Sequence, residues 1–166
     1  MRARRLILTL TMMLSLMAAM FQTASAHSVY DRGFPYQTEG ACTAVRSEIS
    51  DGTGGGGYSR VDAESWFHDP VWNSWCNVQT YKTAYEMRAK YTLIKYNDAT
   101  GNWDWCRNSD WFYNGNGGYS FMIQAWHGEY EPPCGHGYYG TSGGGYVLTN
   151  GQWNGGYVYG WQHYLP

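Results

Sequence analysis

An alternation between apolar and charged side chains marks residues 81–93. Six of the seven odd positions carry tyrosine, methionine, alanine or leucine, and the charged residues occupy even positions: Lys82, Glu86, Arg88 and Lys90. Side chains of a strand alternate between its two faces, so this period of two predicts a β-strand with one buried face. At Ile94 and Tyr96 the apolar residues move to even positions, which predicts either a bulge or an end of the segment that is buried on both faces.

Two tight turns predict antiparallel hairpins. Residues 98–101 fit a type I turn that ends in a left-handed glycine, Gly101, and they return the chain into residues 102–106. Asn150 and Gly151 form the residue pair preferred in type I′ turns, and apolar segments flank them on both sides. Further strands are predicted at residues 43–50, 58–61, 119–126 and 157–164.

One helix is predicted, over residues 62–68, because Asp62 is a suitable N-cap and Pro70 follows its end. The glycine runs at residues 54–57 and 143–145 are predicted to be loops. They lack the helix start and the Lys-Ser/Thr pair of a phosphate-binding loop, which disfavours nucleotide binding.

Glycine and aromatic residues dominate the composition, and this excludes several classes of fold. The 166 residues include 22 Gly, 9 Trp and 16 Tyr. So many rings exclude disorder, and so many glycines disfavour a helical bundle. Together with the hairpins, the composition predicts an all-β fold, a single antiparallel β-sandwich or partly closed barrel. We expect the rings to build the core and its outer margin, where tyrosine hydroxyls reach water.

The first 26 residues have the organisation of a removable signal peptide. A basic start is followed by the uncharged apolar residues 6–21 and by the small residues Ala24, Ser25 and Ala26. An apolar run of 16 residues is shorter than the roughly 18 to 20 residues of a membrane span, so a retained anchor is the less favoured alternative. Cleavage would leave 13 acidic and 8 basic residues, a net charge of −5, which disfavours a nucleic-acid partner. We therefore expect a secreted, extracellular protein.

Four cysteines, separated by 34, 30 and 28 residues, contain no Cys-x-x-Cys pair that would indicate a zinc or redox site. They predict two structural disulfides, as an oxidising compartment permits. Of the three pairings we favour the sequential one, Cys42 with Cys76 and Cys106 with Cys134, because neighbouring strands are usually adjacent in space.

Candidate ligand-binding rings lie within residues 103–113. Alternation places Cys106 on one face and the rings on the other: Trp103, Trp105, Trp111 and Tyr113. If Cys106 is buried, the rings form an outward platform that can stack on a sugar or fill a pocket of a partner. If the rings are core, the disulfide lies at the rim. Large aromatic residues are mostly buried, which favours the core placement.

An amino-terminal arm, residues 27–41, precedes the β-domain of residues 42–166. It carries Tyr30, Phe34 and Tyr36 among polar residues, and Gly33 and Pro35 interrupt any long ladder. We predict that this arm contacts a partner, as an edge strand added to another protein. The alternative left open is that the arm lies across its own domain.

Few residues indicate catalysis. The histidines are scattered singly, and no nucleophile elbow or zinc-binding helix is present in the sequence. Two of the carboxylates could face each other as a glycosidase pair by chance alone; the candidates are Asp104, Asp110, Glu129 and Glu131.

His27, which cleavage would expose, resembles the copper-binding amino-terminal histidine of lytic polysaccharide monooxygenases, which are also secreted, disulfide-bonded β-sandwiches. The resemblance covers His27 alone, and Ser28 follows it where bacterial members commonly have glycine. It implies a copper-dependent enzyme. The rest of the sequence favours a protein without cofactor or catalytic metal.

The last third of the chain, from Cys134 to Pro166, resembles small two-disulfide secreted proteins of actinomycetes, through its repeated Gly-Tyr steps and its His163-Tyr-Leu-Pro end. Some small secreted proteins of these bacteria are adaptor subunits of umbrella toxin particles. The resemblance implies an assembly role in an extracellular complex.

We therefore expect a secreted, non-enzymatic β-domain that binds a secreted protein partner as an assembly subunit. The first alternative is a carbohydrate-binding module that uses exposed Trp and Tyr on an extracellular glycan. The second is an enzyme, copper-dependent or hydrolytic.

Overall fold

The computed structural model describes residues 28–38, 40–51, 57–69, 71, 75–127 and 131–165. Strands are the regular elements of this part of the chain, and no helix occurs in it, so none is long and apolar enough to span a membrane. The strands are β1 (Ser28–Thr38), β2 (Ala41–Ser50), β3 (Tyr58–Phe67), β4 (Val78–Gln79), β5 (Met87–Asn97), β6 (Asn102–Asn108), β7 (Phe112–Tyr113), β8 (Ser120–His127), β9 (Gly137–Thr149) and β10 (Gln152–Leu165).

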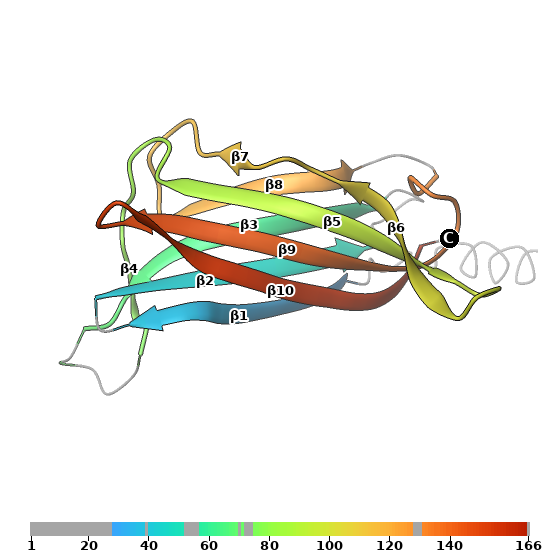
Figure 1. The fold of residues 1–166 in the computed structure, drawn as a ribbon, viewed down its shortest axis with the longest axis horizontal. Helices are drawn as coiled ribbons and strands as arrows, with labels where there is room; N and C mark the ends of the chain where they lie inside the picture. The colour runs from blue at the N-terminus through green and yellow to red at the C-terminus, as the bar shows by residue number, and fades with distance from the viewer. Residues whose placement is uncertain are drawn as a thin grey trace, which may run out of the picture.

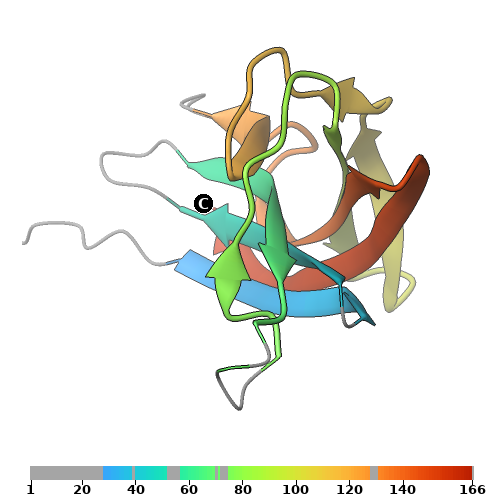
Figure 2. The same ribbon diagram turned by 90° about the vertical axis from the view of Figure 1, so that its left-hand side faces the viewer.

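Two antiparallel sheets pack face to face (Figures 1 and 2). The first has the order β1-β2-β3-β4, with β8 also paired to β3. The second has the order β10-β9-β5-β6, with β7 also paired to β5. Of the two architectures that the sequence allowed, the protein therefore has the sandwich. The edge strands β1 and β10 contact each other where the two sheets meet (Figure 2).

Aliphatic side chains from the inner faces of the two sheets form the core. Val45, Val61 and Ala63 of the first sheet pack with Ala89 and Val158 of the second. A second cluster joins Ile49, Leu93, Tyr139 and Leu165. Tyr139 is the largest fully buried side chain among the described residues. The expectation that rings form the centre of the core was therefore wrong apart from Tyr139, whereas partly buried rings such as Tyr91 and Phe121 do pack at its margin.

The glycines at positions 143–145 lie inside β9 and not in a loop, which corrects the prediction from sequence. A Cβ atom on Gly143 would lie 2.8 Å from a Val61 methyl group, and one on Gly145 would lie 2.7 Å from a Val45 methyl group. These glycines are therefore strand residues that let the two sheets approach closely.

One other prediction from local pattern was wrong, and another held only in part. Residues 62–67 belong to β3 and not to a helix, because alternate residues there, such as Val61, Ala63 and Ser65, are buried against the other sheet. The alternating segment 81–93 becomes a regular strand only at Met87. Before it, the Glu86 carboxylate accepts a hydrogen bond from the Thr83 amide in a turn, and Tyr85 has a positive φ of 64°.

The hairpins and the bulge are confirmed. The 98–101 turn joins β5 to β6 with Gly101 at φ 70°, and Asn150 and Gly151 join β9 to β10 with φ of 53° and 76°. The β5–β6 register shifts between Leu93 and Ile94, where the apolar parity changes. Predicted strands 43–50, 58–61, 119–126 and 157–164 correspond to β2, β3, β8 and β10.

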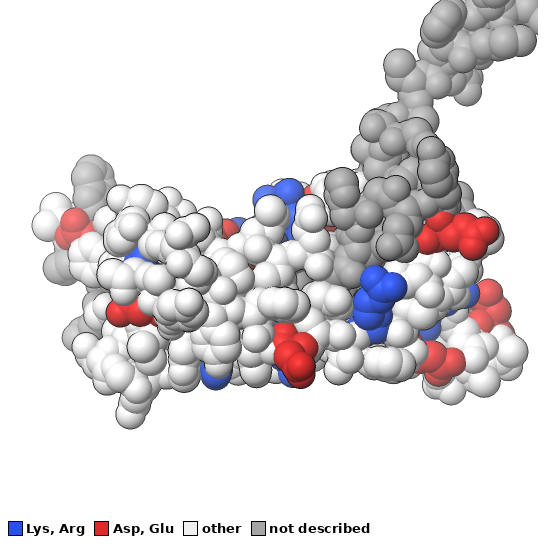
Figure 3. Space-filling model, turned by 90° about the horizontal axis from the view of Figure 1, so that it is seen from above, with Lys and Arg blue, Asp and Glu red and all other residues white. Residues whose placement is uncertain are grey.

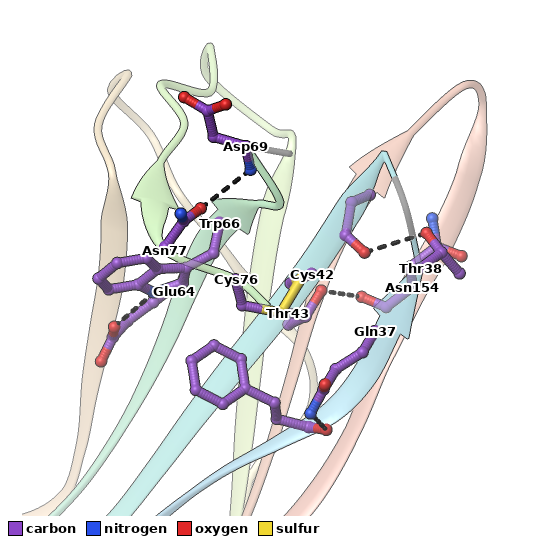
Figure 4. Close-up of a disulfide and its surroundings, with 12 residues drawn as sticks. Gln37, Thr38, Cys42, Thr43, Glu64, Trp66, Asp69, Cys76, Asn77 and Asn154 are labelled. Carbon is purple, nitrogen blue, oxygen red and sulfur yellow. Dashed lines mark hydrogen bonds between the residues drawn. A yellow bond between two sulfur atoms is a disulfide. The ribbon is translucent and has the colours of Figure 1, made fainter. Parts of the chain in front are cut away.

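Both disulfides have the predicted sequential pairing, and they lie toward opposite ends of the sandwich. Cys42–Cys76 joins the start of β2 to the segment before β4, close to Thr43, whose hydroxyl donates to the Asn154 carbonyl of β10 (Figure 4). Cys106–Cys134 joins β6 to the segment before β9. Two closed bonds agree with an oxidising, extracellular location.

Residues 28–38 of the arm form β1, the edge strand paired to β2. Its register shifts between Gly33 and Tyr36, around the predicted interruption at Pro35. The described part of the arm thus lies on its own domain, which was the alternative left open by the sequence.

Candidate binding surface on the second sheet

The outer face of the second sheet carries six of the twelve exposed rings among the described residues. Along β5, Met87, Ala89 and Leu93 point into the core, so Arg88 and Lys90 point outward. Strand pairing aligns these two residues with outward residues of β7, β9 and β10. We call the rings of this surface the aromatic face: Tyr96, Trp103, Trp105, Trp111, Tyr113, Tyr138, Tyr146, Trp153, Tyr157, Tyr159 and Tyr164.

The structure places the four predicted ligand-binding rings on this surface and not in the core. Trp105 is 66% exposed and Tyr113 is 43% exposed, whereas Trp103 and Trp111 are half-buried among other surface rings. The core placement that general burial statistics favoured was therefore wrong. The four rings form two groups: Trp103 packs against Tyr96 at the β6 end, and Tyr113 packs against Trp153 at the β7 end.

Arg88 lies at the centre of the β7 end. Its guanidinium carbon is 4.6 Å from the ring centroid of Trp111, 4.3 Å from that of Trp153 and 5.2 Å from that of Tyr146. The Nε atom is buried without a hydrogen-bond partner among the described residues. Cation–π contacts with three rings hold the charge in place of an ion pair.

Lys90 follows Arg88 by two residues on the same face of β5, and it also contacts rings. Its Nζ lies 5.3 Å from the Trp111 ring centroid and 5.7 Å from that of Tyr157. Tyr157 reaches this position because Gly144 lies beneath it: a Cβ on Gly144 would meet the Tyr157 ring at 2.7 Å. Arg88 and Lys90 are therefore two neighbouring cations that each contact aromatic rings.

A hollow of about 520 Å³ lies beside the β5–β6 hairpin, where Lys95 and Asp104 are on the same side of the second sheet as the buried Tyr139. We call it the hairpin hollow; the side chains that matter in it are Lys95, Tyr96, Asn97, Asp104, Trp105 and His136. The Asn97 amide donates to Asp104 Oδ2 over 2.7 Å, and Lys95 Nζ donates to the Cys134 carbonyl over 2.7 Å. A smaller hollow of about 310 Å³ is lined by Tyr96, Trp103, Tyr138 and Gln162.

The outer face of the first sheet is different, because its charges neutralise one another. Glu48 is 2% exposed and accepts hydrogen bonds from the Tyr58 hydroxyl and from Arg60, with Arg46 Nη2 also 2.8 Å away. The bond to Glu48 raises the pKa of Tyr58. On another side of the molecule, seen from above where β7 and β8 lie, charged side chains form small patches on a largely uncharged surface (Figure 3).

Arg32 and Glu64 form a bidentate ion pair on this charged face. Arg32 Nε donates to Glu64 Oε1 over 3.1 Å, and Arg32 Nη2 donates to Glu64 Oε2 over 2.7 Å. Burial acts to raise the pKa of Glu64, but hydrogen bonds from Arg32 and Trp66 bring it below its ordinary value. Burial raises the pKa of the neighbouring Asp62 carboxyl, which outweighs the opposing charges of Arg60 and Arg46.

The candidate rings of the arm lie on or beside this charged face. Tyr30 is 57% exposed and covers Arg46, with the guanidinium carbon 4.4 Å from the ring centroid. Phe34 packs edge-on against Trp66 and contacts Arg32. Tyr36 is half-buried. Two of these three rings thus contact the arginines of their own domain.

Metal ligands do not gather in the part of the chain that is described: no three His, Cys, Asp or Glu side chains there could hold one ion. His27, the candidate copper ligand, lies outside the described residues, as does Glu129. His68 stacks on Trp75, and His163 Nε2 lies 3.7 Å from Asp51 Oδ1. The copper hypothesis therefore stays a prediction from sequence.

Sequence reasoning missed Arg88, Lys90 and the rings of β9 and β10 as members of the surface. The alternation of residues 81–93 did place Arg88 and Lys90 on the solvent side. Three of the five tyrosines that directly follow a glycine, Tyr138, Tyr146 and Tyr157, belong to the aromatic face.

Comparison with known proteins adds little to this geometry. No family model matches the chain, and no curated protein matches it. Among solved structures, a calcium-binding mutant of Bacteroides uniformis beta-glucuronidase 2 is similar over 82% of this chain, with 11% sequence identity and a TM-score of 0.25. This chain spans 13% of the length of that protein.

Proposed function

We propose that the protein is a secreted, non-catalytic β-domain that binds another secreted protein through the aromatic face, as a subunit of an extracellular complex. One observation carries the proposal: half of the exposed rings of the described residues share the outer face of one sheet, where further half-buried rings lie between them. The six exposed rings of this face are each at least 40% exposed: Trp105, Tyr113, Tyr138, Tyr157, Tyr159 and Tyr164.

A broad exposed aromatic surface supports binding because it is unfavourable in water. Single exposed apolar residues are common, whereas continuous patches usually mark an interaction site. Tyr, Trp and Arg are the residues most enriched at the centres of protein interfaces. The aromatic face combines these three residue types around Arg88.

Charge supports a partner with acidic side chains at its contact surface. Arg32, Arg46, Arg60 and His163 each lie within 4 Å of a carboxylate of their own chain, whereas Arg88 and Lys90 contact rings. A carboxylate from a partner would supply the missing counter-charge in a surface partly shielded from water.

The expected secretion and the two closed disulfides support an extracellular setting. The resemblance of the C-terminal third to small secreted proteins of actinomycetes supports assembly into a larger particle of the umbrella toxin kind.

Affinity capture from the culture fluid of the secreting bacterium tests the proposal with matched variants. The double variant Tyr113→Ser/Tyr157→Ser alters the aromatic face. Met122→Ser removes an equally exposed apolar side chain from the other sheet and serves as the control, and Tyr30→Ser tests the arm.

We expect the parent protein, Met122→Ser and Tyr30→Ser to retain one stoichiometric partner and the double variant to lose it. Equal capture by the double variant, or loss only in Tyr30→Ser, would refute the role of this face. All variants must show the same circular dichroism and melting temperature.

A further inference from the structure

A pocket of about 470 Å³ lies at the end of the sandwich where β4 and the β9–β10 turn are found, at the left in Figure 1. We call it the end pocket. Residues of both sheets line it, among them Ser65, Phe67, Val78, Lys82, Tyr119 and Thr149. None of its lining residues belongs to the aromatic face.

Strand pairing turns these side chains toward the space between the two sheets. Ser65 is 1% exposed, and its carbonyl accepts a hydrogen bond from the Thr80 amide over 2.9 Å. Phe67 pairs with Val78 in the β3–β4 ladder. Because alternate residues share a face, Phe67 lies on the inner side with Ser65, and Val78, Thr80 and Lys82 follow on the same side. The end pocket is therefore the open end of the space between the sheets.

Lys82 brings a positive charge into this space. Its Nζ donates to the Leu148 carbonyl over 2.8 Å and to the Thr149 hydroxyl over 3.3 Å, which bridges from one sheet to the other. Both acceptors are neutral, and the ammonium group has a third proton. The Glu86 carboxylate accepts from the Thr83 amide and does not line the pocket. Among the described residues, the lining thus contains one ammonium group and no carboxylate.

The remaining walls are largely apolar. Phe67 and Val78 are half-buried and contribute their side chains from within. Tyr119 is 50% exposed at the rim, where its ring packs edge-on against Tyr81 with the centroids 5.5 Å apart. Small-molecule sites typically combine apolar walls of this kind with a few polar groups that fix the orientation of the ligand.

We propose that the end pocket binds a small carboxylic acid that has an aromatic or branched apolar body, in its ionised form. The apolar body packs between Phe67, Val78 and Tyr119. The carboxylate accepts hydrogen bonds from the third proton of Lys82 and from the Thr149 hydroxyl. The bond from the ammonium group is charge-assisted, and such bonds are stronger than those between neutral groups. This site is independent of the protein partner and of the aromatic face.

Titration of the isotope-labelled protein with phenylpropanoate, followed by NMR, tests the site, and phenylpropanamide is the neutral control of the same shape. We expect saturable binding with a Kd of about 1 mM or below, and shifts of the Val78, Thr80 and Thr149 backbone amides. Phenylpropanamide should bind about tenfold more weakly, because it lacks the charge-assisted bond. Absence of saturation, equal affinity for the two compounds, or shifts confined to the aromatic face would each overturn the proposal.

Two variants locate the carboxylate and the apolar body. Lys82→Met keeps most of the apolar stem and removes the charge, so it should abolish the preference for phenylpropanoate. Val78→Trp fills the pocket, leaves Lys82 in place and should abolish the binding of both compounds. If Lys82→Met does not fold, Val78→Trp and the comparison of the two compounds still decide the outcome.

Lys95→Met is the matched control. Lys95 also donates to a backbone carbonyl, that of Cys134 over 2.7 Å, but it lines the hairpin hollow and not the end pocket. This variant should bind both compounds like the parent protein. An unchanged preference in Lys82→Met, full affinity in Val78→Trp, or an equal loss in Lys95→Met would contradict the assignment.

Discussion

Trp105 and Cys106 are adjacent in β6, yet their side chains lie in opposite environments. The Trp105 ring is 66% exposed, whereas Cys106 packs against the buried cluster of Ile49, Leu93, Tyr139 and Leu165. Cys106 is also the extra residue of the bulge, since Leu93 pairs with Arg107 and Ile94 with Trp105. The sulfur thus anchors the strand from inside while the ring faces solvent.

Replacement of Trp105 by alanine should leave the free energy of unfolding within about 0.5 kcal/mol of the parent value, as for other surface positions. Truncation of a core ring costs about 3 to 5 kcal/mol, so Tyr139→Ala is the contrasting variant. Urea denaturation measures both. A loss of several kcal/mol in Trp105→Ala would mean that the ring is part of the core.

The disulfides should each contribute about 3.5 kcal/mol, because they close loops of 34 and 28 residues in the unfolded chain. We expect no free thiol in the native protein. Replacing either pair by serine should lower stability by that order, as measured by denaturation. Two titratable thiols in the untreated protein would contradict this account.

Close approach of the sheets at Gly143 should make Gly143→Ala destabilising by about 1 to 3 kcal/mol, since the new Cβ would lie 2.8 and 2.9 Å from the Val61 methyl groups. Gly115→Ala is the control, because nothing lies within 4 Å of a Cβ there. The melting temperatures of the two variants should differ clearly. Equal values would show that the sheets can separate at β9 without loss.

Acid should weaken the fold through Glu64. Its pKa is lower in the folded state, so ionised Glu64 stabilises the protein above the ordinary value of about 4.3, and this contribution is lost as the pH falls through the folded pKa. Glu64→Gln should cost about 1 kcal/mol at pH 7, because Arg32 is partly exposed to solvent. It should also flatten the decline of stability between pH 5 and about pH 3.

The Asp62 carboxyl should have the opposite effect on the pH dependence of stability. Burial raises its folded pKa, so any stability linked to this carboxyl is complete below its unfolded pKa and is lost as the pH rises through the folded one. Asp62→Asn should therefore increase stability at pH 7. Urea denaturation from pH 3 to 7 checks both variants, and an Asp62→Asn protein less stable than the parent at pH 7 would contradict the assignment.

Local signals in the sequence predicted the parts of the fold that depend on local physics. Alternation, Gly101 and the Asn150-Gly151 pair specified strands and hairpins, and chain proximity suggested the disulfide pairs. The predictions for residues 62–68 and 143–145 failed because tertiary packing determines the structure of both segments. Val61 and Ala63 are buried in the core, which requires a strand. Gly143 leaves the space that the Val61 side chain occupies.

The binding surface was only partly predictable. Alternation grouped Trp103, Trp105, Trp111 and Tyr113 on one face, but it could not show whether that face points inward or outward. The contribution of Tyr157 depends on the pairing of β9 with β10 and on Gly144 beneath the ring. A contact between residues that are far apart in the sequence, such as Gly144 and Tyr157, cannot be inferred from the pattern of a short segment.

Oxidative footprinting of the captured complex tests the central claim, the use of the aromatic face in partner binding, most directly. Oxidation of exposed rings by hydroxyl radicals is read by mass spectrometry with and without the partner. We predict that Tyr113, Tyr157 and Tyr159 become protected, while Tyr30 and Met122 on the first sheet react as before. Protection of Tyr30 and Met122 with unchanged reactivity of the three tyrosines would contradict the account.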